Sequence, residues 1–266
     1  MITIAIMGAG GRMGVSLVQN IRNFQNLQLA AAVEQAGHPM VGVDSGTVAG
    51  CAPNGVPVTD DLAAAVARAD VVVDFTFHEA VPAVAEQVRR HRKAYVLGTT
   101  GLTAEELAGV KAAAEVAPVL MAPNMSLGVN LLLTLVKQAA AVLGVDYDAE
   151  IVEMHHRHKK DAPSGTALAL AKAVAAGRGV AFGDVARHGR EGIVGERKAG
   201  EIAVHAVRGG DVVGDHVVMF ATDGERVELT HKASSRGAFS SGALRAAEWL
   251  VKQKPGFHEI SEMLGL

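Results

Sequence analysis

The segment at residues 155–166 holds the densest group of side chains that could do chemistry. Three histidines, one arginine and two lysines fill positions 155–160, and Ala162-Pro163-Ser164-Gly165-Thr166 follows. Histidine exchanges a proton near neutral pH, and a nearby cation neutralises a carboxylate. Glycine and hydroxyl residues at a helix start present backbone N–H groups to an anion. The segment therefore predicts a site for a small dianion, with proton-transferring groups beside it.

Two other interpretations of this segment compete with a dianion site. Histidines could ligate a metal, but no cysteine is near them, and adjacent histidines on an extended chain point in different directions. We therefore expect no metal. A solvated basic loop would account for the charges, but not for the Ala-Pro-Ser-Gly-Thr that follows.

A glycine-rich turn near the N-terminus is the second candidate site. Glycines at positions 8, 10, 11 and 14 follow a β-branched apolar run and precede apolar residues at helical spacing. The spacing is a variant of the dinucleotide fingerprint, because Met13 stands where the last glycine is usual. Glu34 ends the next apolar run, where an acid binds the adenosine ribose hydroxyls. The alternative is a turn needed only for strand–helix packing. The expected cofactor contacts here are Gly8, Ala9, Gly10, Gly11, Arg12, Met13 and Glu34.

Two further turns extend the expected cofactor site. Gly98-Thr99-Thr100-Gly101 and Ala122-Pro123-Asn124-Met125 each follow a strand candidate, at the edge where open α/β sheets bind ligands. We expect them to contact the nicotinamide ribose and amide. The residues concerned are Gly98, Thr99, Thr100, Ala122, Pro123, Asn124 and Met125. Phe75-Thr76 is a similar candidate with less support.

The elements that must position these residues fall into two groups. Continuous apolar runs, among them 94–97, alternate with helical stretches over the first 125 or so residues, which predicts a parallel sheet covered on both faces. One helical stretch, 103–114, opens with Thr-Ala-Glu-Glu, which resembles a capping box. Later β-rich segments are punctuated by Gly209-Gly210-Asp211 and Asp223-Gly224, which are hairpin signals. A helix over 240–252 should return to the first domain. The expected fold is α/β, a Rossmann-like doubly wound parallel sheet with an inserted α+β substrate and oligomerisation domain. Its boundaries are 1–126 plus 237–266 for dinucleotide binding, and 127–236 for the insertion.

Composition excludes several classes of protein. The chain has 266 residues, is 49% hydrophobic and 20% charged, and carries a formal net charge of -3. Disordered and fibrous classes are excluded, and no global charge favours nucleic acid or an anionic membrane. The single cysteine, Cys51, cannot form an internal disulfide, and no base stands beside it to make it a nucleophile. With no signal core and no apolar run able to span a bilayer, we expect a cytoplasmic protein.

The chain resembles the 4-hydroxy-tetrahydrodipicolinate reductase family, also called dihydrodipicolinate reductase, of the diaminopimelate route to lysine. The matching motifs appear in family order over essentially the whole chain, and the block from Glu153 to Thr166 is the most specific. The others are residues 8–14, 73–76, 98–101, 124–130 and 230–236.

The resemblance implies an NAD(P)H-dependent reduction of a cyclic dicarboxylate to tetrahydrodipicolinate. It implies that His155 is a proton donor and acceptor, that Lys159 is a second proton donor, and that His156, Gly165 and Thr166 bind substrate. It also implies a homotetramer assembled through the sheets of the second domains.

Gln35 departs from the family pattern, because members that use the phosphorylated cofactor often carry arginine there. We therefore expect NADH to be preferred and NADPH to be usable.

Two competing functions remain. Another aspartate-pathway dehydrogenase would keep the glycine turn and Glu34, but has no reason to carry the histidine block. A non-catalytic dinucleotide sensor needs no acid at the substrate, so the presence of both His155 and Lys159 argues against it.

Overall fold

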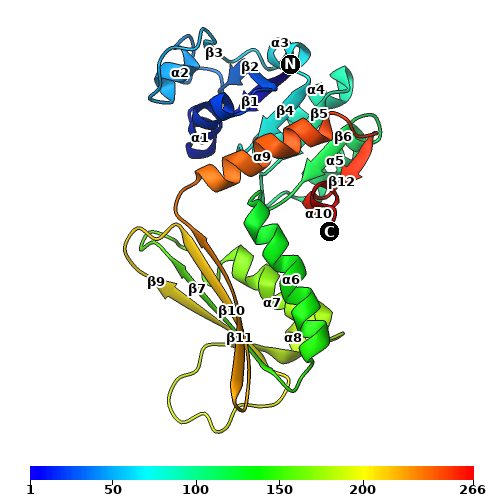
Figure 1. Cartoon of the computed structure of the whole chain (residues 1–266). Helices are drawn as coiled ribbons and strands as arrows, with labels where there is room; N and C mark the ends of the chain where they lie inside the picture. The colour runs from blue at the N-terminus through cyan, green and yellow to red at the C-terminus, as the bar shows by residue number, and fades with distance from the viewer. The chain divides into compact units, whose positions relative to one another are not determined.

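The computed structural model describes residues 1–266 and divides into two compact units (Figure 1). Unit 1 comprises Met1–Leu127 and Arg236–Gly265, and unit 2 comprises Gly128–Ser235 with the terminal Leu266. Unit 2 is therefore inserted into the sequence of unit 1. No helix has the length and apolar character that crossing a bilayer requires.

Unit 1 contains a parallel sheet of seven strands in the order β12-β6-β5-β4-β1-β2-β3. All six pairs of neighbouring strands run parallel. The strand order reverses between β1 and β4, which is the switch point where open α/β sheets bind ligands. This arrangement confirms the predicted Rossmann-like fold. The strands are β1 Ile2–Met7, β2 Leu27–Val33, β3 Val58–Thr59, β4 Val71–Asp74, β5 Ala94–Leu97, β6 Pro118–Met121 and β12 Gly256–His258.

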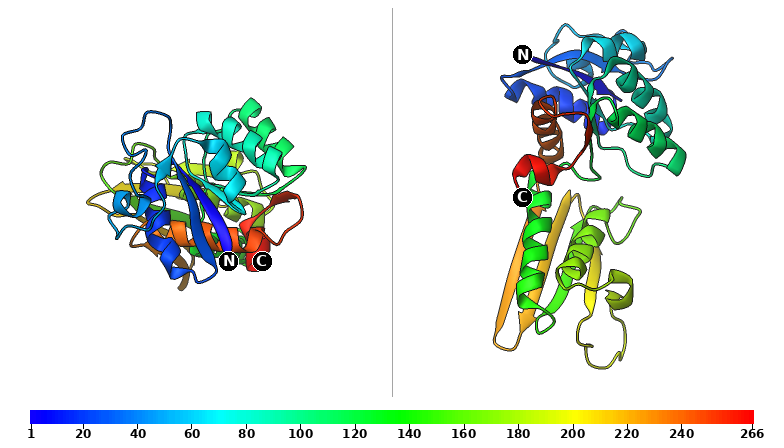
Figure 2. Two further views of the ribbon diagram at one scale, coloured as in Figure 1. Left: turned by 90° about the horizontal axis from the view of Figure 1, so that it is seen from above. Right: turned by 90° about the vertical axis from the view of Figure 1, so that its right-hand side faces the viewer.

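Helices cover both faces of this sheet. Ile4 and Ile6 of β1 pack in one buried cluster with α1 and α9, while Ala5 and Met7 pack in a second cluster with α3, α4 and α5 (Figures 1 and 2). Successive side chains of one strand thus enter opposite layers, which explains why the strands are continuous apolar runs. The helices are α1 Arg12–Asn20, α2 Ser45–Val48, α3 Leu62–Arg68, α4 Val81–His91, α5 Ala104–Ala114, α9 Gly237–Leu250 and α10 Ile260–Leu264, with 3₁₀ turns at Ile21–Asn23 and His78–Ala80.

Local sequence signals explain where some helices begin. The capping box expected before α5 is present: Thr103 Oγ1 accepts a bond from the Glu106 N–H, and the Thr103 N–H donates to Glu106 Oε2 at 2.7 Å. This pair satisfies two of the N–H groups that a helix start leaves without a partner.

Unit 2 contains a mixed sheet of five strands in the order β11-β10-β7-β9-β8. Strand β9 runs parallel to β7 and β8, while β10 runs antiparallel to β7 and β11. Helices α6 and α7 cover one face of the sheet (Figures 1 and 2). The strands are β7 Asp148–His155, β8 Ala186–His188, β9 Ile202–Arg208, β10 Gly214–Thr222 and β11 Glu225–Ala233, and the helices are α6 Leu127–Leu143, α7 Gly165–Gly177 and α8 Phe182–Val185.

One of the two predicted hairpins is wrong. Asp223-Gly224 does join β10 to β11, and Gly224 takes the positive φ of 89° that such a turn needs. Gly209-Gly210-Asp211 joins β9 to β10, but these strands are not neighbours, because β7 lies between them. The turn residues were recognised correctly, whereas the pairing of the strands depends on contacts distant in sequence.

Candidate active site

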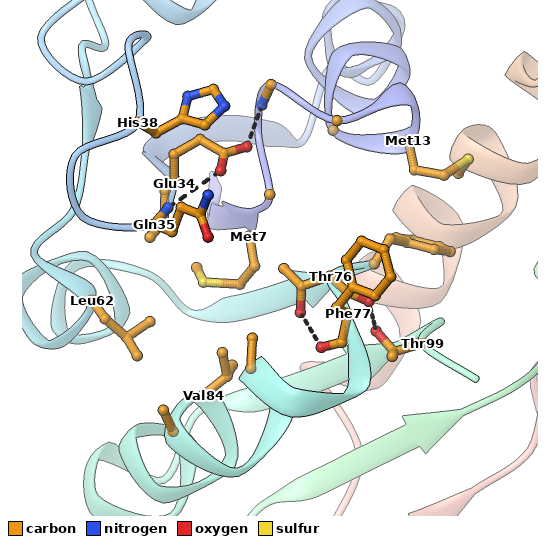
Figure 3. Close-up of a pocket in the computed structure, with 18 of the residues that line it drawn as sticks. Met7, Met13, Glu34, Gln35, His38, Leu62, Thr76, Phe77, Val84 and Thr99 are labelled. Atoms are coloured by element: carbon orange, nitrogen blue, oxygen red, sulfur yellow. Dashed lines mark hydrogen bonds between the residues drawn. The ribbon is translucent and has the colours of Figure 1, made fainter. Parts of the chain in front are cut away.

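A cavity of about 1070 Å³ lies in unit 1 at the carboxyl ends of the central strands (Figure 3). It brings together three segments that the sequence motifs had singled out: the glycine turn, the end of β2 and the turn after β5. The expected cofactor residues that line it are Gly8, Gly10, Gly11, Arg12, Met13, Glu34, Gly98, Thr99 and Thr100.

The glycine turn leaves the start of α1 open to an anion. Gly8 has a φ of +66°, and its carbonyl oxygen accepts a bond from the Gly11 N–H at 3.0 Å. A Cβ on Gly14 would lie 2.1 Å from that oxygen, so only glycine allows the turn to pack this closely on the helix. No side chain caps α1, and no acidic residue lies in its first turn. Its N–H groups therefore suit a pyrophosphate.

Glu34 holds the glycine turn from the end of β2. Its Oε1 accepts a bond from the Gly10 N–H at 2.9 Å, and its Oε2 accepts one from the Gln35 N–H at 3.2 Å (Figure 3). An ionised carboxylate has lone pairs for further donors, such as ribose hydroxyls. Gln35 and His38 also line the cavity.

A buried carboxylate, Asp74, connects two turns that line the cavity. Asp74 Oδ1 accepts bonds from the N–H and the hydroxyl of Thr76 at 2.8 and 2.7 Å, and Tyr95 donates to Oδ2 at 2.7 Å. Thr99 in turn donates to the Thr76 carbonyl oxygen at 2.9 Å (Figure 3). Burial raises the pKa of Asp74. Burial and the neighbouring Asp74 carboxylate together raise the pKa of Tyr95. This network ties the turns after β4 and β5 to each other.

Several cavity residues carry no motif and were missed by sequence reasoning. Phe77, 84% exposed, presents its ring at the cavity, and beside it His78 forms a 2.8 Å ion pair with Glu106 that raises the pKa of His78. Only the strand order shows that these residues belong to the site. The others are Met7, Val33, Ala36, His38, Asp60, Leu62, Ala80, Ala83 and Val84. Gly14, Gln35, Phe75 and Thr76 also line the cavity, and the sequence had already indicated them.

Some expected cofactor residues do not line this cavity. Ala9 is buried and donates its N–H to the Val33 carbonyl oxygen at 3.0 Å, so it fastens the turn to β2. Residues 122–125 follow β6; Met125 is buried in the core, and Asn124 accepts a bond from the Ser126 N–H at 2.9 Å.

The histidine block of unit 2 is built around Glu153, whose side chain is fully buried. The His155 Nδ1 lies 2.5 Å from Glu153 Oε2, and two Arg208 nitrogens lie 2.8 Å from the two carboxylate oxygens. The Ser164 N–H donates to Oε1 at 3.0 Å. Burial alone would raise the pKa of Glu153, but the bonds from Arg208 and His155 outweigh it and lower that pKa.

The Ser164 N–H bond to Glu153 places the start of α7 beside His155, and two further contacts hold the preceding loop. Lys159 pairs with Asp161 at 2.9 Å, and Arg208 donates to the Asp161 carbonyl oxygen at 2.7 Å. Ser164 caps α7, with its Oγ accepting a bond from the Ala167 N–H at 3.1 Å. Gly165 begins the helix and faces open space. The structure thus brings together a histidine, a lysine and a helix N-terminus, as a site for a carboxylate anion requires.

His216 is a further member of this group that sequence reasoning missed. It lies opposite Glu153 in the register of β10 and β7, is 3% exposed, and has its ring centroid 5.2 Å from that of His155. Its Nε2 lies 3.2 Å from Ser164 Oγ. Burial lowers the pKa of His216 to about 4 and keeps the ring neutral. No group of three or more histidine, cysteine or acidic side chains is placed to hold a metal ion.

Family models and relatives match this chain along its full length. The model of the dihydrodipicolinate reductase N-terminus matches residues 2–125, and that of the C-terminus matches residues 128–264. A 4-hydroxy-tetrahydrodipicolinate reductase of Anaeromyxobacter dehalogenans is 50% identical over 100% of this chain and 98% of its own length. One of Dinoroseobacter shibae is 49% identical over 99% of this chain and 98% of its own length.

A solved structure has the same fold. The dipicolinate-bound dihydrodipicolinate reductase of Paenisporosarcina sp. TG-14 has a TM-score of 0.77 and 28% sequence identity, covering 99% of both chains. Together with the family models and relatives, it shows that the chain belongs to the dihydrodipicolinate reductase family of NAD(P)H-dependent oxidoreductases.

Proposed function

We propose that the cavity of unit 1 binds NADH and that the His155 group of unit 2 binds 4-hydroxy-tetrahydrodipicolinate and transfers a proton during its reduction to tetrahydrodipicolinate. The reaction belongs to the diaminopimelate route to lysine. The observation that carries the proposal is the Glu153–His155 pair beside the N-terminus of α7, because it combines a proton carrier with an anion site.

The cavity fits a dinucleotide along its length. The uncapped start of α1 suits the pyrophosphate, Glu34 suits the ribose hydroxyls, and the tied turns at Thr76 and Thr99 suit the nicotinamide end. When bound, the cofactor supplies a hydride. We include residues 122–125 in this site, because they follow β6 at the same edge of the sheet.

The residues around the ribose favour NADH over NADPH. The negative charge of Glu34 repels a 2′-phosphate, and Gln35 supplies no cation to offset it. Arg12 and His38 line the same cavity and leave NADPH usable. Gln35→Arg should improve the catalytic efficiency with NADPH relative to NADH by about fivefold, as a partly exposed ion pair of about 1 kcal/mol allows. A wild-type enzyme that strongly prefers NADPH at low salt would contradict this reading of Glu34 and Gln35.

In unit 2, His155 transfers the proton and Lys159 assists. His156, Gly165 and Thr166 hold the substrate carboxylates, since N–H and hydroxyl donors at a helix start favour negative charge. The Lys159–Asp161 pair keeps the lysine head beside the block until substrate displaces the aspartate.

The test compares two alanine variants with their exposed neighbours. His155→Ala and Lys159→Ala should each lower kcat by about 10²–10⁴-fold, the usual worth of a general acid, and leave the Kd for NADH unchanged. His158→Ala and Lys160→Ala remove exposed residues of the same types from the same loop, and should retain activity. Near wild-type turnover in both site variants would refute the assignment.

We also propose a cytoplasmic homotetramer assembled through unit 2. The sheet face opposite α6 and α7 carries partly exposed apolar side chains, among them Val152, Val217 and Met219, and Val207 is 42% exposed. An apolar sheet face of this kind suits another sheet. A single cysteine fits a reducing compartment. Light scattering of the purified protein distinguishes a tetramer from a monomer.

A further inference from the structure

We infer that Glu153 is a positioning residue: fixed by Arg208, it holds the His155 imidazole with its Nδ1 proton turned inward, so that Nε2 alone exchanges a proton with the substrate. The inference rests on the proposed role of His155 and adds to it the group that sets the ring's orientation and tautomer.

The contacts of Glu153 leave its carboxylate no freedom to rotate. Oε1 accepts bonds from the Ser164 N–H at 3.0 Å and from Arg208 Nη2 at 2.8 Å. Oε2 accepts a bond from Arg208 Nη1 at 2.8 Å and faces His155 Nδ1 at 2.5 Å. All the other partners are donors, and an ionised carboxylate can only accept. The His155 Nδ1 therefore carries a hydrogen that it donates to Glu153, which assigns the tautomer of the neutral ring.

The assignment fixes which nitrogen reacts. With Nδ1 committed to Glu153, only Nε2 can gain or lose a proton during turnover. This atom lies against the backbone at Gly214, where a Cβ would come within 3.1 Å of it. A glycine at this position leaves room beside Nε2 that a larger residue would fill.

Charged and titratable side chains surround the His155 ring, and they come from several elements. Strand β9 supplies Arg208, β10 supplies the buried, neutral His216, and the loop before α7 supplies Lys159 and Asp161. Strand β11 supplies His231, whose ring centroid is 6.5 Å from that of His216. Glu153 is the carboxylate hydrogen-bonded to the imidazole. It therefore places a negatively charged acceptor directly against the Nδ1 side of the ring.

A matched control lies three residues earlier on the same strand. Glu150 also accepts bonds from arginines, Arg190 and Arg197, and from a histidine, His205, at 2.6 Å. Because side chains alternate along a strand, Glu150 and Glu153 point to opposite faces of the sheet. Glu150→Gln thus disturbs the same kind of cluster without touching His155.

The first experiment measures the pH dependence of kcat in Glu153→Gln and Glu150→Gln. Glu153→Gln should lower kcat by roughly tenfold to a hundredfold, less than the loss of the general acid itself. The alkaline limb of the kcat–pH profile of Glu153→Gln should move to lower pH by about one unit, because the imidazolium loses its anionic partner. Glu153→Asp, which restores the charge, should return the limb toward the wild-type position. Glu150→Gln should keep the wild-type profile.

Binding of dipicolinate serves as the check on folding. A Kd for dipicolinate within about threefold of wild type shows that the anion site of Glu153→Gln is intact, and the loss then lies in kcat. If Glu153→Gln does not fold, Arg208→Lys keeps the positive charge but loses one of two bonds to the carboxylate. It should show a smaller change of the same kind. An unchanged alkaline limb in whichever variant folds overturns the inference.

The second experiment combines Glu153→Gln with His155→Ala. If Glu153 acts through His155, adding Glu153→Gln to His155→Ala should change kcat by less than about threefold. A further loss as large as in the wild-type background overturns the inference and leaves the role of His155 intact. If His155→Ala alone retains wild-type kcat, the proposed role of His155 fails, and the inference fails with it.

Discussion

Replacing His216 by glutamine should make the free energy of unfolding less sensitive to acid. His216 is 3% exposed, and burial lowers its pKa from the usual 6.5 to about 4. Below pH 6.5 the unfolded chain binds a proton at this position that the native chain does not bind. Unfolding is therefore increasingly favoured as the pH falls from 6.5 toward 4. Above pH 6.5 the ring is neutral in both states, and the effect is absent.

The size of the effect follows from the pKa difference. Each pH unit below 6.5 lowers the free energy of unfolding by about 1.4 kcal/mol until the native ring also titrates. At pH 5 this free energy is therefore about 2 kcal/mol lower than at pH 7.5. The other histidines contribute equally to wild type and His216→Gln, and cancel in the difference between them. The variant also changes the contact with Ser164 Oγ, which shifts its stability at every pH but not the slope.

Urea unfolding followed by circular dichroism at pH 5.0, 6.0 and 7.5 measures the slope. Protein concentration must stay fixed, because subunit association adds to the apparent stability. His188→Gln removes an exposed histidine and is the control for losing any one imidazole. Between pH 7.5 and 5.0, we expect the free energy of unfolding to fall by about 2 kcal/mol more in wild type and His188→Gln than in His216→Gln. Equal losses in all three proteins would refute the reasoning.

Three further predictions concern groups in both units. Tyr95→Phe should leave Asp74 with one donor fewer, lower the free energy of unfolding by about 1–3 kcal/mol in urea titrations and raise the Michaelis constant for NADH. Gly14→Ala should weaken NADH binding at least about tenfold in fluorescence titrations, because the added Cβ would clash with the glycine turn. The control is Gly109→Ala in α5, where no atom lies within 4 Å of the added Cβ; it should raise the free energy of unfolding by about 0.5–1 kcal/mol. Thr166→Val should raise the Michaelis constant for substrate about tenfold or more, as the loss of a bond to a carboxylate worth about 1.5–3 kcal/mol requires, and an unchanged constant would place the anion site elsewhere.

The fold was predictable where a local pattern determines it. The strand expected at 94–97 and the cap at Thr103 appear as expected, since apolar runs and capping boxes are local. Helix α4 received no expectation, although Val81, Val84, Ala85 and Val88 have helical spacing and are all buried. That periodicity would have identified it. The pairing of β7 with both β9 and β10 had no local signal, because strand partners depend on distant contacts.

The candidate site divides in the same way. Residues 155–166 are contiguous, so their types and order were informative without a structure. Arg208 and His216 come from other strands, and only the register places them against Glu153. Glu34 illustrates an intermediate case: its place at the end of β2 was expected, whereas its bond to the Gly10 N–H was not.

The insertion of unit 2 also determines the order in which the protein can be completed on the ribosome. Strand β12 and helices α9 and α10 are synthesised after unit 2, yet β12 pairs with β6, and α9 packs against β4, β5 and β6. Until these elements emerge, the apolar layer that contains Ile4, Val71 and Val96 lacks part of its cover. The nascent chain thus carries an unfinished nucleotide-binding layer throughout the synthesis of the entire inserted unit. Exposed apolar surface of this kind attracts chaperones and promotes aggregation. Unit 1 is therefore protected from aggregation only when α9 and α10 have been synthesised, long after the glycine turn.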